Sequence, residues 1–178
     1  MSNVALTHVE ATAQLTAPGQ MFEVDRAEVD GIEMAVWKNA PTSLRQILEL
    51  SLGHGAKEFL VYEDQRITFE EHYRISSTLA QRLIDDGAKK GDRIAIASRN
   101  LPEWIMAFWG SMITGAVVVP LNAWWTTDEL IYGLSDSGAS VLFVDEERLE
   151  RVRPRLDELS SLRTIVVLSE DHSRSTRL

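Results

Sequence analysis

The 178-residue sequence contains no cysteine. Disulfide bonds, thiolate nucleophiles and cysteine-ligated zinc are therefore excluded as sources of stability or chemistry. Basic residues are also scarce, with 18 lysines and arginines against 27 aspartates and glutamates, and the formal net charge is -9. Because phosphate backbones attract basic surfaces, this balance argues against nucleic acid as a partner.

Long hydrophobic runs are missing as well. No stretch reaches the apolar length that a helix needs to cross a bilayer. The N-terminal residues lack the basic and apolar regions of a secretory signal peptide. We therefore expect a cytoplasmic protein with no integral membrane segment.

Several motifs of well-known enzyme classes are absent from the sequence. There is no G-x-G-x-x-G after a strand, no G-x-x-x-x-G-K-[ST] phosphate loop, no G-x-S-x-G and no H-E-x-x-H. The four histidines lie without the spacing of metal ligands; they are His8, His54, His72 and His172. We assign no catalytic residue and no metal ligand to this chain.

Four short apolar runs recur along the second half of the sequence. They cover residues 93–98, 117–121, 140–145 and 164–169, and their starts are 24, 23 and 24 residues apart. Each interval suits one strand, one helix and two short loops. Continuous apolar character predicts strands buried on both faces, as in a parallel sheet. The predicted fold is α/β, a doubly wound and mostly parallel sheet with flanking helices.

The first part of the chain has a different pattern. Residues 1–41 lack sustained periodicity and contain prolines and glycines, which predicts an extended N-terminal arm with room for short strands around Gly31. Residues 42–170 are predicted to form the α/β domain, which begins with a helix and a hairpin. Residues 171–178 are predicted to be a polar C-terminal tail.

Helix starts are marked by capping boxes, in which Thr or Asn is followed three residues later by Glu. The predicted boxes are Thr68 with Glu71, Asn100 with Glu103, and Thr126 with Glu129. If Thr126 is the N-cap, Trp125 and Leu130 take the positions of a hydrophobic staple. Trp125 is therefore assigned a structural role, and its neighbour Trp124 is left without a partner on the helix.

Candidate binding residues follow from the predicted sheet, because ligands of parallel sheets bind beyond the carboxyl ends of the strands. The loops at that edge are residues 98–100, 122–125, 145–146 and 169–171. From them we select Arg99, Asn100, Asn122 and Trp124 as substrate-binding or inter-domain residues. Asn100 has a simpler interpretation as a helix cap. Residues 145–147 and the arginines at 148, 151, 153 and 155 are interpreted as a solvated helix start and a solvated charged face.

Four segments together resemble the N-terminal part of the AMP-forming adenylating enzymes, which include acyl-CoA synthetases. They are "ITFEE" (67–71), "KKGDRIAIASRNLPEW" (89–104), "GAVVVPLN" (115–122) and "ELIYGLSDSGASVLFVD" (129–145). "RNLPEW" and "PLNAWW" favour the fatty-acyl and related CoA ligase branch over the peptide-synthetase branch. The layered α/β fold of that family agrees with the fold predicted from the periodicity.

The resemblance implies a two-step reaction. A carboxylate attacks ATP to give an acyl-adenylate and pyrophosphate, and the thiol of CoA then displaces AMP. In the family, ATP and Mg²⁺ are held by a Gly/Ser/Thr-rich loop and by acidic and lysine residues further along the chain. The 178 residues contain no such loop ending in P-K-G. We therefore expect an N-terminal fragment that binds no cofactor by itself and is inactive alone.

Two other interpretations stay open. One is a stand-alone, non-catalytic binding or interaction module derived from the same fold. The other is a flavodoxin-like signalling domain, which is disfavoured because its acidic pair and lysine are missing. As partners we expect the remainder of the enzyme, or self-association through an exposed face. Peripheral membrane contact through the arginines of residues 148–155 is a minor alternative.

Overall fold

The computed structural model describes residues 6–168, and contacts between residues divide the chain into two units, the first ending at Ser43 and the second beginning at Leu44. The predicted C-terminal tail and the loop at residues 169–171 lie outside the described residues. None of the described helices combines the length and the apolar character needed to span a membrane. The two units are described in turn.

The N-terminal unit contains one helix and one hairpin. Helix α1 (His8–Leu15) begins at a capping box formed by Thr7 and Glu10, a helix that the sequence analysis did not assign. Strands β1 (Val24–Val29) and β2 (Ile32–Trp37) pair antiparallel around Asp30 and Gly31, which both have positive φ angles. Two positive φ values at the centre of a two-residue loop match the twist of a hairpin.

One face of this hairpin is apolar except for Asp25, which pairs with Val36. Because directly paired residues point to the same side, the cross-strand pairs place five apolar side chains together, namely Ala27, Val29, Ile32, Met34 and Val36. None of them is buried within the described residues, and Ile32 is 63% exposed. We call this surface the apolar hairpin face. A two-stranded hairpin is marginally stable in water by itself, so this face is suited to being covered.

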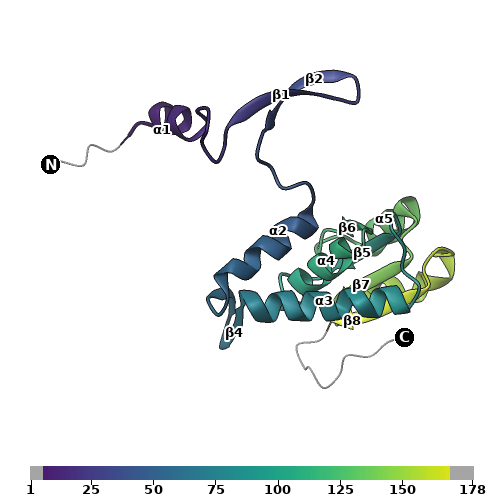
Figure 1. Ribbon diagram of the computed structural model, residues 1–178. Coiled ribbons are helices and arrows are strands. Elements are labelled where there is room, and N and C mark those ends of the chain that lie inside the picture. The colour runs from purple at the N-terminus through teal and green to yellow at the C-terminus, as the bar shows by residue number, and fades with distance from the viewer. Residues whose placement is uncertain (1–5, 169–178) are drawn as a thin grey trace. The chain divides into compact units, whose positions relative to one another are not determined.

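The second unit is built on a four-stranded parallel sheet (Figure 1). Its strands are β5 (Arg93–Ala97), β6 (Val117–Pro120), β7 (Val141–Asp145) and β8 (Thr164–Leu168). They lie in the order β6-β5-β7-β8. The predicted parallel α/β fold is therefore confirmed. The connections run in opposite directions from β5, so the switch point of the sheet lies between β5 and β7.

Helices cover both faces of the sheet. On one face, α3 (Phe69–Asp85) and α4 (Pro102–Ile113) pack on a cluster that includes Ile94, Ile96 and Phe143, and α2 (Leu44–Ser51) packs beside them. On the other, α5 (Thr127–Ser137) and α6 (Glu146–Val152) pack on a cluster that includes Ala95 and Leu142. A short 3-10 helix (Arg153–Glu158) follows α6. Successive strand residues alternate between the two clusters, which explains the continuous apolar runs in the sequence.

The hairpin in front of α3 consists of β3 (Glu58–Tyr62) and β4 (Gln65–Thr68). Thr68 ends β4 and also caps α3. Its hydroxyl accepts a hydrogen bond from the Glu71 N–H, and the Glu71 carboxylate accepts one from the Thr68 N–H. Thr126 and Glu129 form the same pair of hydrogen bonds at the start of α5.

The third predicted capping box is wrong. Helix α4 begins at Pro102, its N-cap is Leu101, and no side chain caps the helix there. Proline favours the first helical position because its missing N–H would have no helical partner and its φ angle is already suitable. Pro102 therefore sets the helix start one residue later than Asn100 and Glu103 would require.

His72 is the least expected polar residue of the core. It lies on α3 with 1% of its surface exposed, and neither ring nitrogen has a hydrogen-bond partner in the described part of the chain. The ring stacks on Phe59 at 4.2 Å and meets the edge of Trp109 at 6.1 Å. Burial lowers the pKa of His72 to about 4. The imidazole is thus held neutral in an aromatic pocket.

The burial of the neutral His72 imidazole predicts that the protein loses stability in mild acid. Below the ordinary pKa of 6.5 the unfolded chain binds a proton at His72 that the folded chain does not bind until pH falls to about 4. The free energy of unfolding should fall by about 3 kcal/mol across this interval from this group. Urea denaturation at a series of pH values should show the fall, and His72→Phe should abolish this component.

The matched control is His54→Phe, which replaces an exposed histidine. It should keep the pH dependence of the unchanged protein. An unfolding free energy of His72→Phe that falls as steeply as that of the unchanged protein would show that His72 is not the titrating group.

Candidate functional site

Three of the selected residues meet at the carboxyl edge of the sheet. Arg99 follows β5, and Asn122 and Trp124 follow β6. The Arg99 guanidinium carbon lies 4.2 Å from the centre of the Trp124 ring. We call this contact the Arg99–Trp124 pair. A guanidinium over an indole is attracted by the negative face of the ring, so the two side chains hold each other in place.

Trp124 is also fixed through its backbone. The Asn122 side-chain oxygen accepts a hydrogen bond of 2.9 Å from the Trp124 N–H. The Trp124 side chain nevertheless remains 69% exposed. A large apolar ring that is held in place but left open to solvent is typical of a surface that another group covers.

The interpretation of residues 145–147 as a solvated helix start holds for Glu146 and Glu147, which are exposed in the first turn of α6, and is wrong for Asp145. Asp145 is only 7% exposed, and its side chain caps α6 by accepting the Arg148 N–H at 2.9 Å. Its other oxygen accepts the backbone N–H of Arg99, also at 2.9 Å. Asp145 therefore ties the loop after β5 to the end of β7 across the switch point.

Arg148 was interpreted as a solvated arginine, and this is wrong. Its side chain is 1% exposed and forms an ion pair of 3.0 Å with Asp145. Its Nε donates a hydrogen bond of 2.7 Å to the carbonyl oxygen of Ala123 in the loop after β6. The sequence signal that could have revealed it is an aspartate that ends a fully apolar strand, with an arginine three residues later.

The remaining arginines of this segment are paired with carboxylates. Arg151 and Arg148 both contact Glu147, Arg153 pairs with Glu150, and Arg155 pairs with Asp128 and Glu158. Arg151 also donates to the Trp125 carbonyl oxygen at 2.7 Å. Interleaved charges of both signs reduce the attraction of this surface for anionic lipid.

Trp125 turns away from Trp124 and packs against α5. Its ring lies against the core cluster that contains Leu130, its expected staple partner. Gly133 lies under the ring, since a Cβ atom at that position would stand 2.9 Å from Trp125 Cζ3. The neighbouring tryptophans thus have different surroundings, one largely exposed and the other half-buried.

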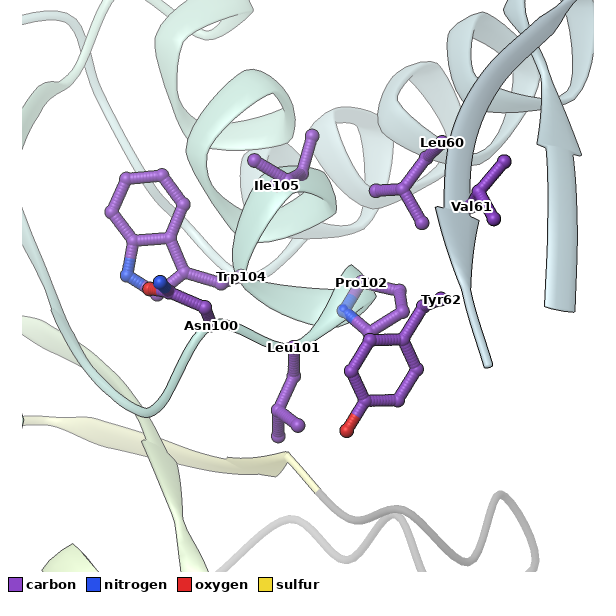
Figure 2. Close-up of a pocket in the computed structure, with 8 residues that line it drawn as sticks. All are labelled: Leu60, Val61, Tyr62, Asn100, Leu101, Pro102, Trp104 and Ile105. Atoms are coloured by element: carbon purple, nitrogen blue, oxygen red, sulfur yellow. The ribbon is translucent and has the colours of Figure 1, made fainter. Parts of the chain in front are cut away.

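Asn100 belongs to a different feature. It lines a cavity of about 430 Å³ between the end of β3 and the start of α4. Figure 2 shows the residues around this cavity. Apart from Asn100 and the Tyr62 hydroxyl, the lining is mostly apolar, and the other lining residues are Leu60, Val61, Tyr62, Leu101, Pro102, Trp104 and Ile105. Trp104 stacks on Phe108 with ring centres 5.6 Å apart. Arg99 and Asn100 are neighbours in sequence, but they serve separate surfaces.

The side chains at this edge are suited to binding a partner. Within residues 6–168 there is no group of three histidine, aspartate or glutamate side chains that could hold a metal ion. The described residues also include no Gly/Ser/Thr-rich phosphate loop ending in P-K-G. What they provide is an open indole face backed by a guanidinium, which suits a planar or electron-rich partner.

Comparison with known proteins identifies a family. The model of the AMP-binding enzyme family matches residues 50–178. The chain is 36% identical over 86 residues to the 2-succinylbenzoate–CoA ligase of Bacillus subtilis, which covers 48% of this chain and 18% of that enzyme. It is 30% identical over 115 residues to 4-hydroxybutyrate–CoA ligase 2 of Metallosphaera sedula, covering 65% of this chain and 20% of that enzyme.

A linear gramicidin synthase is similar at the same level. This protein of Brevibacillus parabrevis is 33% identical over 112 residues, covering 63% of this chain and 1% of its own length. Sequence identity by itself therefore does not separate the CoA ligases from the gramicidin synthase. The chain spans about a fifth of the length of the two CoA ligases that it matches.

One solved structure agrees with this family, and a second agrees with the fold. The anthranilate CoA ligase AuaEII, in complex with anthranoyl-AMP, superposes with a TM-score of 0.70 and 27% identity, covering 73% of this chain and 26% of that one. The N-terminal domain of FACL13 from Mycobacterium tuberculosis has a TM-score of 0.66 at 24% identity, covering 71% and 33% of the two chains, and shows the fold alone.

The different surroundings of the two tryptophans predict different effects of their removal. Trp125→Ala should lower the free energy of unfolding by about 2–3 kcal/mol, because it empties the space over Gly133. Trp124→Ala should lower it by about 1 kcal/mol or less, the contribution of an exposed cation–π contact. Urea denaturation of both variants measures the difference. Equal losses of stability would contradict this division of roles.

Proposed function

Because the chain belongs to the AMP-binding enzyme family, we propose that it forms the N-terminal part of an ATP-dependent acyl-CoA ligase. The observation that supports this most directly is the family match, which begins at residue 50 and includes the whole parallel sheet and its flanking helices. Two CoA ligases of different substrate acids are among the similar sequences, and a third is among the similar structures.

In the proposed reaction a carboxylate oxygen attacks the α-phosphorus of ATP, and pyrophosphate leaves. The CoA sulfur then attacks the acyl carbon of the adenylate, and AMP leaves. Mg²⁺ supplies charge neutralisation for the phosphates. Because the sequence contains no Gly/Ser/Thr-rich loop ending in P-K-G, we propose that ATP, Mg²⁺ and CoA are bound with residues beyond these 178.

The role of this chain in the reaction is then positional. We propose that Arg99, Asn122 and Trp124 contact the substrate or the remainder of the enzyme at the carboxyl edge of the sheet. Support comes from the exposure of Trp124 and from the hydrogen bond that holds its backbone. We propose a similar contact for Asn100 at the cavity beside β3.

Exposed apolar side chains support a covering partner as well. In the second unit, Leu50, Val61, Val117, Trp124 and Tyr132 are each more than half exposed. In the N-terminal unit, the apolar hairpin face is open within the described residues. The remainder of the enzyme would cover such surfaces, and in its absence we propose that copies of the chain cover one another.

The 178-residue chain alone should show no carboxylate-dependent exchange between ATP and pyrophosphate above background. The matched positive sample is a chimaera in which residues 44–168 replace the equivalent part of the M. sedula 4-hydroxybutyrate–CoA ligase. It should retain measurable exchange with 4-hydroxybutyrate. Exchange by the 178 residues alone would contradict the proposed division of the site, and a folded but inactive chimaera would favour a non-catalytic module.

Self-association is tested by light scattering coupled to gel filtration. The purified chain should elute as a dimer or larger species at high concentration. Ile32→Glu, on the apolar hairpin face, should shift it toward the monomer, because the added charge would be buried in the contact. Ala35→Glu lies on the opposite face of the same hairpin and should not. A clean monomer of the unchanged chain at high concentration would refute self-association.

A further inference from the structure

One buried ion pair links three loops at the carboxyl edge of the sheet. Asp145 accepts three hydrogen bonds, from the backbone N–H of Arg99, the backbone N–H of Arg148 and the Arg148 guanidinium. Through these bonds the loop after β5 is held against the start of α6. We call the two residues the Asp145–Arg148 pair.

The guanidinium extends the link to the third loop. Arg148 Nε donates to the Ala123 carbonyl oxygen at 2.7 Å while Nη1 donates to Asp145 at 3.0 Å. The fork of donors in arginine is rigid, so these two bonds fix the distance and angle between the loops after β6 and β7. With 1% of Arg148 exposed, water does not compete for these donors.

The Arg99–Trp124 pair stands on the two loops that are joined in this way. Arg99 is attached through its own N–H to Asp145, and Trp124 follows directly after Ala123. The 4.2 Å contact between them therefore spans loops whose separation is set beneath the surface. A pair of long, exposed side chains would otherwise have considerable freedom.

We propose that Asp145 and Arg148 are positioning residues, which hold Arg99 over Trp124 by fixing the loops that carry them. The pair itself would not touch a ligand. It would act by presenting the indole face in one orientation, so that less ordering is needed when the face is covered. This proposal deepens the proposed role of Arg99 and Trp124, and it rests on that role only for the identity of the group that the two residues contact. The positioning itself can be measured without enzymatic turnover.

The test is ¹⁹F NMR of the full chain labelled with 5-fluorotryptophan. Trp124→Phe assigns the Trp124 resonance, and Arg99→Ala gives its position when the guanidinium is removed. Arg148→Lys keeps the charge beside Asp145, but its single ammonium cannot reproduce the fork to the Ala123 carbonyl. The Trp124 resonance should move at least about halfway toward its Arg99→Ala position, with the Trp37 and Trp109 resonances unchanged.

Arg153→Lys is the matched control, because Arg153 lies on the same segment and pairs with exposed Glu150. It should leave the Trp124 resonance in place. Asp145→Asn is a second variant, because a carboxamide has one acceptor oxygen for three donors. If Arg148→Lys and Asp145→Asn fold and leave the Trp124 resonance unmoved, the proposal is overturned, even if both lower the unfolding midpoint.

Amide exchange in the unchanged protein decides the case if neither variant folds. The Arg99 and Arg148 N–H groups both donate to Asp145, so locked loops should give them protection factors within about tenfold of each other. An Arg99 N–H that exchanges more than about tenfold faster than that of Arg148 would show that its loop moves independently, and would overturn the proposal.

Discussion

The parallel sheet of the second unit must bury both of its faces, and the rest of that unit follows from this constraint. Each strand needs a crossover helix to reach the next parallel strand, so helices cover the two faces and the loops collect at the sheet edges. The alternation of Ile94 and Ala95 between the two core clusters is the local form of this requirement. At the carboxyl edge, the loops after β5, β6 and β7 are brought together whatever their own sequences prefer.

The loops at that edge are irregular and need a contact that holds them in place. The buried ion pair between Asp145 and Arg148 supplies that contact. Breaking a buried ion pair leaves an unpaired charge, which commonly costs about 3–5 kcal/mol, so the arrangement is strongly held once formed. The loops that carry the exposed Arg99–Trp124 pair are therefore held in place by this ion pair.

The N-terminal unit has a different relation to the family. The family match begins at residue 50, after the apolar hairpin face and the helix α1. The family match therefore includes the sheet and helices α3 to α6, whereas the first unit, with its own capping box, its own turn and an apolar face that none of its described residues buries, lies before it. Its contacts are a question separate from the chemistry of the sheet edge.

The sequence alone determined the sheet and much of its frame. Regular apolar runs predicted parallel strands, and Thr68 and Thr126 marked helix starts, because burial and capping are local patterns. Local patterns failed where distant residues decide. Pro102 displaced the expected cap at Asn100, and Arg148, which looks like one charge on a helical surface, is buried against Asp145 and Ala123. Only the tertiary structure could place it there, because the Ala123 carbonyl oxygen that its Nε contacts comes from the loop after β6, which is a neighbour in the folded sheet and not along the chain.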